Sequence, residues 1–204
     1  GALMQSIEIR KLEDNEKTRN AATTIFIDAY YKDLCVFSRD REVLHNAFRN
    51  SFLLDHFYGA FVDGELAGIY ALTDERERCI RIVKKDFVAS FGWIKGSLFA
   101  MPMKNEFEHP ITLQKEGSFI EAVAVAEKFQ GQGIGKAMMQ HAITVSPYLE
   151  LDVTDANVRA KRLYEKIGFT TFREVPEKHF TKAKGFTKRF YMHYTRPVTP
   201  EGDK

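Results

Sequence analysis

Three glycines interrupt an apolar stretch in the middle of the chain, Phe119–Ala137, which reads FIEAVAVAEKFQGQGIGKA. The β-branched residues before them suit a buried strand, and Gly131, Gly133 and Gly135 carry no Cβ atom to keep a ligand from the backbone. At the start of a helix, such a turn offers unpaired N–H groups and the positive end of the helix dipole to a phosphate or pyrophosphate. With the cation of Lys136 nearby, the glycines predict an anion-binding turn.

Two other glycine-rich phosphate motifs fit these letters poorly. A P-loop needs Gly at its first position and Ser or Thr after the Lys, but Gln130 and Ala137 stand there. A dinucleotide fingerprint needs two residues between its last two glycines, whereas Ile134 alone separates Gly133 from Gly135. The letters therefore exclude the P-loop and disfavour the dinucleotide site.

Two blocks of the chain resemble a known enzyme family. Gln130–Gly135, QGQGIG, resembles the acetyl-CoA signature of the GCN5-related N-acetyltransferases, in which Arg or Gln is followed by two residues, Gly, one residue, and Gly or Ala. Leu151–Phe169, LDVTDANVRAKRLYEKIGF, resembles the same family in its strand, its Asn and its closing Tyr-Glu-Lys-x-Gly-Phe. The two motifs agree with the family in order and separation, so the chain is identified as a member over about Ser6 to Tyr194.

The resemblance implies the family's α/β fold, with a mixed, mostly antiparallel central sheet flanked by helices and splayed between strands near 119–126 and 149–153. It implies acetyl-CoA as cosubstrate, with the pantetheine in the splay and the pyrophosphate on the glycine turn. Asn157 is carried over as a cofactor-side residue, and helix capping explains it equally well. The cofactor-binding residues implied in this way are Val123, Ala124, Val125, Gln130, Gly131, Gln132, Gly133, Ile134, Gly135, Lys136 and Asn157.

Acetyl transfer to an amine needs a neutral nucleophile, a polarised thioester carbonyl and a proton for the departing thiolate. By family analogy, the backbone N–H near Val125 polarises the carbonyl. Tyr164 matches the family's general acid, and its phenol has a reference pKa of about 10, near that of a thiol; a core tyrosine is the alternative. Strand alternation puts Glu121 on the same face as Val123, where its carboxylate accepts the amine's proton. A structural ion pair is the alternative for Glu121.

The other reactive side chains give weaker signals. None of the six histidines has metal-ligand spacing, so no metal is expected, and His109 is kept as an alternative base. Cys35 and Cys79 lie outside both motifs, which favours direct transfer in a ternary complex over a covalent acyl-enzyme. A basic cluster near the end of the chain favours a solvated hairpin over an anionic partner; its members are Lys178, Lys182, Lys184, Lys188 and Arg189.

Length and composition favour one soluble domain in the cytoplasm. The 204 residues hold 30 basic and 28 acidic side chains, and a net charge of +2 indicates neither nucleic acid nor a membrane surface as partner. No leader and no bilayer-spanning run is recognisable. Residues 1–3 are interpreted as a cloning scar, 4–196 as the acetyltransferase domain and 197–204 as a flexible tail.

Periodicity and turn signals predict the elements that position these motifs. Strands are expected over 6–12, 58–62, 66–72, from Ser118, and over 149–153, 169–175 and 188–194; helices are expected near 13–29, 41–55, 134–145 and 157–167. Loops are expected over 30–40 and 104–115, and a solvated charged segment over 73–81. The apolar insertion Phe87–Met103 is interpreted as a helix packed in the core or in a homodimer interface, with a substrate lid as the alternative; Gly92 and Gly96 weaken a long helix there.

The acceptor is not identified by these signals and is expected to be a small-molecule or peptide amine. Five aromatic residues either line its pocket or are ordinary core: Tyr30, Tyr31, Phe37, Phe91 and Trp93. A non-catalytic CoA-responsive domain and, more distantly, a nucleic-acid-binding module are the rival functions.

Overall fold

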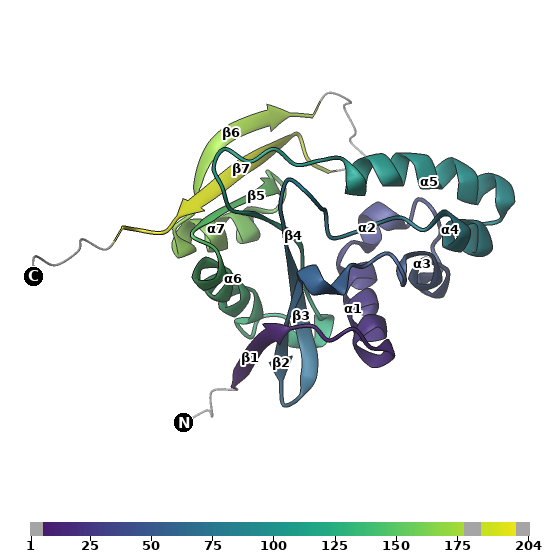
Figure 1. The fold of residues 1–204 in the computed structure, drawn as a ribbon, viewed down its shortest axis with the longest axis horizontal. Helices are drawn as coiled ribbons and strands as arrows, with labels where there is room; N and C mark the ends of the chain where they lie inside the picture. Colours follow the sequence, from purple (N-terminus) through teal and green to yellow (C-terminus); the bar gives the residue numbers. More distant parts are fainter. Residues whose placement is uncertain (1–5, 178–184, 199–204) are drawn as a thin grey trace, which may run out of the picture.

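The computed structural model describes residues 6–177 and 185–198. The described residues form a seven-stranded sheet with the order β1-β2-β3-β4-β5-β7-β6. Helices α1 to α5 cover one face of the sheet, and α6 and α7 cover the other (Figure 1). The strands are β1 Ile7–Lys11, β2 Phe57–Val62, β3 Glu65–Thr73, β4 Ser118–Val125, β5 Tyr148–Thr154, β6 Thr170–Pro176 and β7 Lys188–Thr195. The helices are α1 Glu16–Ala29, α2 Tyr31–Leu34, α3 Arg41–Phe48, α4 Lys84–Phe91, α5 Trp93–Glu108, α6 Ile134–Val145 and α7 Val158–Ile167.

The predicted splay lies between β4 and β5, the parallel pair in the sheet. The two strands pair only at Ser118↔Leu149 and Phe119↔Glu150, and they diverge beyond that point. A Cβ atom on Gly117 would lie 2.2 Å from the carbonyl oxygen of Tyr148, so only glycine lets the chain enter β4 this close to β5. The sheet is therefore open along most of β4 on its β5 side.

A β-bulge interrupts β4 inside this open region. Ile69 pairs with Ala124, and Ala71 pairs with Glu121. Two steps along β3 therefore correspond to three steps along β4, which holds one extra residue. The extra residue coincides with Ala122, whose φ of 54° lies in the left-handed region. That conformation costs a non-glycine residue about 1–2 kcal/mol. The bulge reverses the side-chain alternation on either side of it.

The bulge corrects the prediction that Glu121 shares a face with Val123 and Val125. Glu121 contacts Cys79, which belongs to the hydrophobic cluster under α1. Val123 and Val125 pack against the opposite cluster, beneath α6. Strand alternation alone does not detect the inserted residue, so the sequence assigned Glu121 to the wrong side of the sheet.

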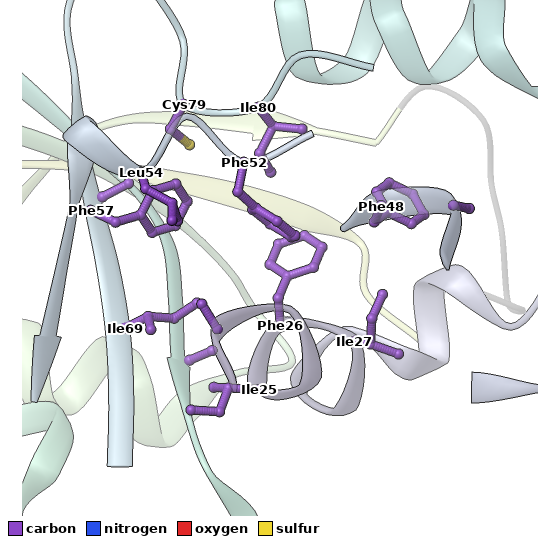
Figure 2. Close-up of a cluster of buried hydrophobic side chains, with 14 of the residues drawn as sticks. Ile25, Phe26, Ile27, Phe48, Phe52, Leu54, Phe57, Ile69, Cys79 and Ile80 are labelled. Atoms are coloured by element: carbon purple, nitrogen blue, oxygen red, sulfur yellow. The ribbon is translucent and has the colours of Figure 1, made fainter. Parts of the chain in front are cut away.

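Two hydrophobic clusters hold the helices to the sheet. In the first, Phe26 of α1 packs edge-on against Phe52 with 5.0 Å between ring centroids, and Phe52 packs against Phe57 of β2 (Figure 2). Truncating a buried Phe to Ala costs about 3–5 kcal/mol in such a position. The second cluster joins α6 and α7 to the other face through Met138 and Phe169, which are almost fully buried. Both faces of the sheet are thus covered by packed helices.

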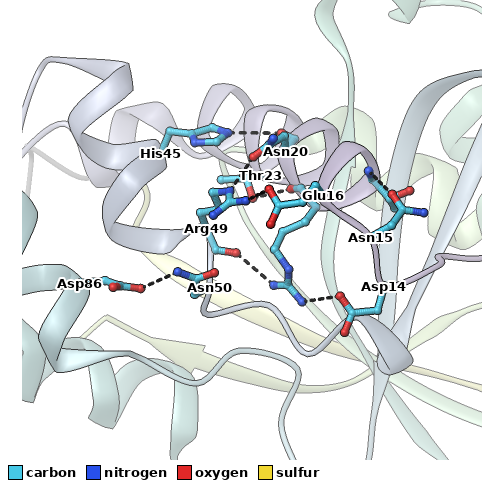
Figure 3. A network of polar contacts seen from close by, with 11 residues as sticks. Asp14, Asn15, Glu16, Asn20, Thr23, His45, Arg49, Asn50 and Asp86 are labelled. Atoms are coloured by element: carbon cyan, nitrogen blue, oxygen red, sulfur yellow. Dashed lines mark hydrogen bonds and ion pairs between the residues drawn. The ribbon is translucent and has the colours of Figure 1, made fainter.

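Polar contacts tie α1 to α3 at the edge of the first cluster (Figure 3). The Asn15 side chain caps α1 by accepting from the N–H of Thr18 at 2.9 Å. The Arg49 guanidinium donates to the side chain of Asn20 at 2.6 Å, and Arg19 donates to the carbonyl of Phe52 at 2.9 Å. These contacts fix the helix from which Tyr30 reaches the sheet.

The predicted hairpin is confirmed, with left-handed φ angles at Asp63 and Gly64 of 50° and 77°. The loop prediction for 104–115 is wrong at its start, because α5 continues to Glu108. Gly92, with a φ of 89°, separates α4 from α5, whereas Gly96 lies buried inside α5, where a Cβ atom would meet Val88 at 2.5 Å. Gly96 therefore permits close packing of α5 on α4 and does not break the helix.

Smaller differences concern the segments around these helices. The predicted loop over 30–40 contains the short helix α2, and α3 ends at Phe48. The segment 73–81 is mostly exposed as expected, but Cys79 is buried. Three members of the basic cluster lie outside the described residues (Lys178, Lys182 and Lys184), and the other two belong to β7.

No helix in the described part of the chain is long and apolar enough to cross a membrane.

Candidate active site

The glycine turn has the geometry expected of an anion site. Gly131 and Gly133 have φ angles of 75° and 81°, and Gly133 is the N-cap of α6 without any side-chain cap. A Cβ atom at either position would meet nothing within 4 Å, so the backbone angle, and not lack of space, requires glycine there. From Gly133 to Lys136, the N–H groups have no hydrogen-bond partner among the described residues. These donors lie at the positive end of α6.

Neighbouring side chains hold the turn in place. The amide of Gln132 donates to the carbonyl of Lys128 at 3.3 Å, and Lys128 pairs with Glu65 of β3 at 2.7 Å. Ile134 is buried against Gly68, where a Cβ atom would lie 2.8 Å from the Ile134 methyl group. Lys136 is exposed and has no carboxylate partner within the ranges that the structure covers. The start of α6 is thus clamped while its cation remains available.

The open edge of β4 presents backbone groups to the splay. The N–H of Ala126 donates to the carbonyl of Ala67 at 2.8 Å, which identifies this residue pair as hydrogen-bonded. Because hydrogen-bonded and non-hydrogen-bonded pairs alternate in an antiparallel ladder, the N–H and C=O of Val125 point away from β3. The Val125 carbonyl accepts from the side chain of Gln130 at 3.1 Å. The Val125 N–H therefore faces the splay, as the family analogy requires of it.

Tyr30, which follows α1, contacts β4 next to the bulge. Its buried hydroxyl donates to the Val123 carbonyl at 3.2 Å. Burial raises the pKa of Tyr30, and the charges of Tyr164 and Asp152 raise it further, with smaller effects from Cys79 and Glu121. Tyr30 therefore lies within electrostatic reach of both predicted catalytic residues. Its sequence signal, an aromatic residue at the end of a helix, had suggested only a pocket wall or core.

Tyr164 extends from α7 and is 8% exposed. Burial raises the pKa of Tyr164 to about 12, with a further contribution from the negative charge of Asp152. The ring packs near Phe169 with 6.0 Å between centroids. The phenol is therefore protonated at neutral pH and lies close to a carboxylate of β5. The core interpretation of Tyr164 is confirmed, and its role as general acid stays a prediction.

Glu121 is held in an ion pair with Arg78. The Arg78 Nε donates to both carboxylate oxygens at 3.0 and 3.1 Å, and Nη2 makes a further short contact. Arg78 also donates to the carbonyls of His109 and Glu106, at 2.8 and 3.2 Å, and so joins the end of α5 to β4. The thiol of Cys79 lies 3.6 Å from the remaining side of the carboxylate. The structural ion pair that the sequence left open for Glu121 is present.

Asp152 on β5 is a second carboxylate, which the sequence analysis missed. Burial raises the pKa of Asp152, and the guanidinium of Arg189, 3.7 Å away, opposes the shift; the charges of Glu121 and Glu106 add to it. A signal existed, because Glu150 and Asp152 alternate with apolar residues along Leu149–Val153. The acids of that strand share one face. Glu150 itself is buried and accepts from the Tyr148 hydroxyl and the Gln114 N–H, both at 2.7 Å.

A cavity of about 760 Å³ lies at the root of the splay, on the face that carries Glu121. Its wall includes Arg78, Glu121, Asp152, Arg189 and Tyr191, contributed by strands on both sides of the splay and by the segment before α4. None of the five aromatic residues first considered as pocket walls lines it. The lining is mixed, because charged side chains of β4, β5 and β7 lie beside apolar ones such as Phe119 and Phe172.

The remaining predicted residues have mixed outcomes. Asn157 is the N-cap of α7, and its side chain accepts from the N–H of Ala160 at 3.2 Å, so the capping interpretation is confirmed. Contact of Asn157 with a cofactor stays a prediction. His109 lines the cavity. Cys79, placed outside the site by its sequence position, touches Glu121; burial raises the pKa of its thiol, so it is not a thiolate nucleophile.

Comparisons with known proteins agree with this geometry. Residues 19–169 match the family described as "Acetyltransferase (GNAT) family". Over 53 residues the chain is 38% identical to the peptidyl-lysine N-acetyltransferase YjaB of Salmonella typhimurium, a stretch that covers 26% of this chain and 37% of that protein.

Solved structures of low sequence identity share the fold. The ribosomal-protein-S18-alanine N-acetyltransferase from Escherichia coli superposes with a TM-score of 0.55 at 17% identity, covering 98% of this chain and 99% of the other. A Bacillus subtilis acetyltransferase solved in complex with CoA gives a TM-score of 0.52 at 16% identity, with 93% and 99% coverage. The predicted mixed sheet, flanked by helices and splayed between β4 and β5, is confirmed.

Proposed function

The chain belongs to the GNAT acetyltransferase family, and on that premise we propose that it transfers the acetyl group of acetyl-CoA to a primary amine, directly and within a ternary complex. The observation that carries the proposal is the combination of an open β4 edge with an uncapped glycine turn at the start of α6. Both features offer backbone donors to one extended ligand. CoA, with a pyrophosphate and a pantetheine arm, is a ligand of that kind.

The residues of the chain fit acetyl-CoA without a side-chain pocket of special shape. The free N–H groups from Gly133 to Lys136 suit the pyrophosphate, and the Lys136 cation adds charge complementarity. The Val125 N–H, pointed into the splay, suits the thioester oxygen. Acetyl-CoA supplies the activated acetyl group, and the protein supplies the hydrogen bonds that orient and polarise it.

We assign the role of proton acceptor to Asp152 in preference to Glu121. Both oxygens of Glu121 already accept from the Arg78 guanidinium, so Arg78 occupies the side of the carboxylate that an amine would have to contact. Among the residues that the structure describes, Asp152 pairs with the more distant Arg189 alone, and its pKa is raised, which makes it the better base. Glu121 becomes a positioning residue, since its ion pair holds Arg78 and, through it, the end of α5.

Tyr164 is assigned as the proton donor to the departing sulfur. The substrate ammonium gives one proton to Asp152, and the neutral amine then attacks the thioester carbon. As the C–N bond forms and the C–S bond breaks, Tyr164 gives its proton to sulfur, and the Tyr164 phenolate takes the second proton from nitrogen. The two roles support each other, because the negative charge of Asp152 contributes to the high pKa of Tyr164. Once Asp152 is protonated, that contribution disappears and the phenol becomes a stronger acid.

The acceptor is proposed as a small-molecule or peptide amine. Support comes from the carboxylates along the cavity wall, which attract an ammonium group, and from the name of the Salmonella relative, which specifies peptidyl-lysine. A panel of amines, polyamines, aminoglycosides and lysine-containing peptides, assayed by release of the CoA thiol, would identify the class. If no member of a broad panel released thiol although acetyl-CoA bound, the non-catalytic CoA-responsive domain would be favoured.

Isothermal titration with acetyl-CoA tests the premise directly. We expect saturable binding at one site by wild-type protein. The variant Tyr164→Phe, which removes only the proton donor, should bind acetyl-CoA like wild type and lose turnover. Absence of binding by folded wild-type protein would reject the proposal.

A further inference from the structure

Helix α5 exposes an apolar stripe that the proposed chemistry does not use. Ile94, Leu98 and Met101, which follow one another at i, i+4 and i+7, are 67%, 66% and 77% exposed, and Trp93 beside them is 77% exposed. Residues with this spacing lie on one side of a helix. Single exposed apolar residues are normal on protein surfaces, but a contiguous stripe of large ones marks a binding surface.

The opposite side of α5 is already packed. Gly96 and Ala100 are buried, and Phe99 contacts Phe37 with 4.8 Å between ring centroids. A Cβ atom on Gly96 would lie 2.5 Å from the Cα atom of Val88, so α5 cannot turn about its axis without losing its close contact with α4. The stripe is therefore held outward by the fold. For Phe87–Met103, packing in the core is confirmed on one side of α5, whereas the dimer interface and the substrate lid stay predictions.

Lysines border the stripe on both sides. At about 100° per residue, Lys95 lies roughly 100° from Ile94 in one direction around the helix, and Lys104 lies roughly 80° from it in the other. Both lysines are exposed, and the segment Trp93–Asn105 contains no Asp or Glu; the two acids of α5, Glu106 and Glu108, stand in its last turn, where Glu108 accepts from the N–H of Ile82. An apolar stripe with cations along both edges and tryptophan at one end is the arrangement of helices that lie in the surface of an anionic bilayer.

We propose that α5 docks this protein on an anionic phospholipid surface, with the apolar stripe in the interfacial layer and Lys95 and Lys104 at the headgroups. Long lysine side chains suit this position, because their stems cover apolar surface while the ammonium group reaches out to phosphate. The docking is peripheral and requires no spanning helix. This proposal differs from the expectation of no membrane partner. That expectation rested on the net charge of the whole chain, which does not reveal how cations are arranged on one helix.

A second copy of the chain is the weaker occupant of the stripe. Two α5 helices packed face to face would bring their lysine borders together, and the segment Trp93–Asn105 offers no carboxylate to pair with them. Like charges opposed across an interface disfavour association. Anionic lipid headgroups supply the missing negative charge.

Trp93 makes the proposal directly measurable, because it is the only tryptophan in the chain. The full-length protein is mixed with vesicles of phosphatidylcholine alone or with phosphatidylserine added, and Trp93 emission and co-sedimentation are followed. We expect a blue shift and sedimentation with the phosphatidylserine vesicles, both weakened by high salt. Phosphatidylcholine alone should give little of either.

Two sets of variants separate the contributions. The double variant Leu98→Glu/Met101→Glu should abolish vesicle binding. Lys95→Gln/Lys104→Gln should weaken it about 25-fold, from about fivefold for each lysine near an anionic surface. As a matched control, Val145→Glu alters an exposed valine on α6, across the sheet, and should leave binding unchanged. All the altered side chains are exposed, and unchanged circular dichroism and melting temperature verify the fold.

Three results would overturn the proposal. The first is the absence of a blue shift and sedimentation with phosphatidylserine vesicles by folded wild-type protein. The second is vesicle binding that the stripe variants do not reduce. The third is a dimer, detected by analytical ultracentrifugation, that the Leu98→Glu/Met101→Glu variant dissociates while wild type ignores vesicles, because a second copy would then cover the stripe.

Discussion

The glycine turn and the cavity proposed for the acceptor adjoin the same strand, β4, yet they are built in different ways. The turn uses backbone groups of consecutive residues, which are positioned by the φ angles of two glycines and the start of α6. The cavity uses side chains from β4, β5, β6, β7 and the segments before α4 and after α5. A site made of backbone is encoded locally, whereas a site made of side chains depends on how distant elements pack.

The largest effect is expected in the cavity. Asp152→Asn should lower kcat by about 10²–10⁴-fold, because the amide cannot accept the amine's proton. The KM for acetyl-CoA should change little, since the turn is untouched. Steady-state kinetics with an acceptor from the thiol-release panel measure both quantities. If Glu121→Gln, and not Asp152→Asn, produced this loss, the assignment of the two carboxylates would have to be exchanged.

A second test concerns the ion pair behind the cavity. Arg78→Gln should destabilise the protein by about 3–5 kcal/mol, because it leaves the largely buried carboxylate of Glu121 without its cation. The double variant Arg78→Gln/Glu121→Gln should recover much of that loss, since no unpaired charge remains. Urea unfolding followed by circular dichroism measures the free energy of unfolding of each variant. Equal losses in the single and double variants would show that packing, and not charge pairing, is the main contribution.

The glycine turn allows a matched pair of substitutions. Gly133→Ala and Gly64→Ala place the same side chain at φ angles of 81° and 77°, and neither added Cβ atom meets a neighbour within 4 Å. Each should cost about 1–2 kcal/mol of stability. Only Gly133→Ala should also weaken acetyl-CoA binding in calorimetry, because only that turn is assigned to the pyrophosphate. If both variants lost acetyl-CoA binding equally, the assignment of the glycine turn to the pyrophosphate would be rejected.

The smallest expected effect is a pH dependence that belongs to the cavity alone. The pKa of Asp152 is raised in the folded protein, so its contribution to stability is fully present below about pH 4 and is lost as pH rises through the folded pKa. The side chain of the Asp152→Asn variant does not titrate. The melting temperature of the variant minus that of wild type should therefore be more positive at pH 7.5 than at pH 3.5. A difference that is constant with pH would contradict the raised pKa.

The conformation of the glycine turn, which we propose as the cofactor site, was predictable from the sequence because its signals are local. QGQGIG followed by helical periodicity predicted the turn, and Asn157 and Gly168 marked the ends of α7 correctly. The Asp63-Gly64 hairpin was predicted for the same reason, since two residues determine the turn type. In each case, the residues that specify the conformation are neighbours in the chain.

The contacts around the cavity, which we propose as the acceptor site, were predicted less well because the partners are distant in sequence. Arg78 and Glu121 are separated by 43 positions, and nothing in either segment announces the pair. The bulge at Ala122 is equally hidden, since alanine is not a residue that favours a positive φ. Asp152 carried a usable signal in the alternation of its strand, but its role depends on the splay that opens beside it.

By itself, the sequence determined the family, the glycine turn and the order of the strands and of most helices, because these depend on short-range backbone preferences and apolar periodicity. Only the tertiary structure decided which face Glu121 occupies, that Glu121 and not Asp152 is paired closely with an arginine in the described part of the chain, and which side of α5 meets the solvent. Those outcomes depend on contacts between elements far apart in the chain and on one inserted residue in β4. The free energy of such contacts is a property of the packed fold, and no single segment contains it.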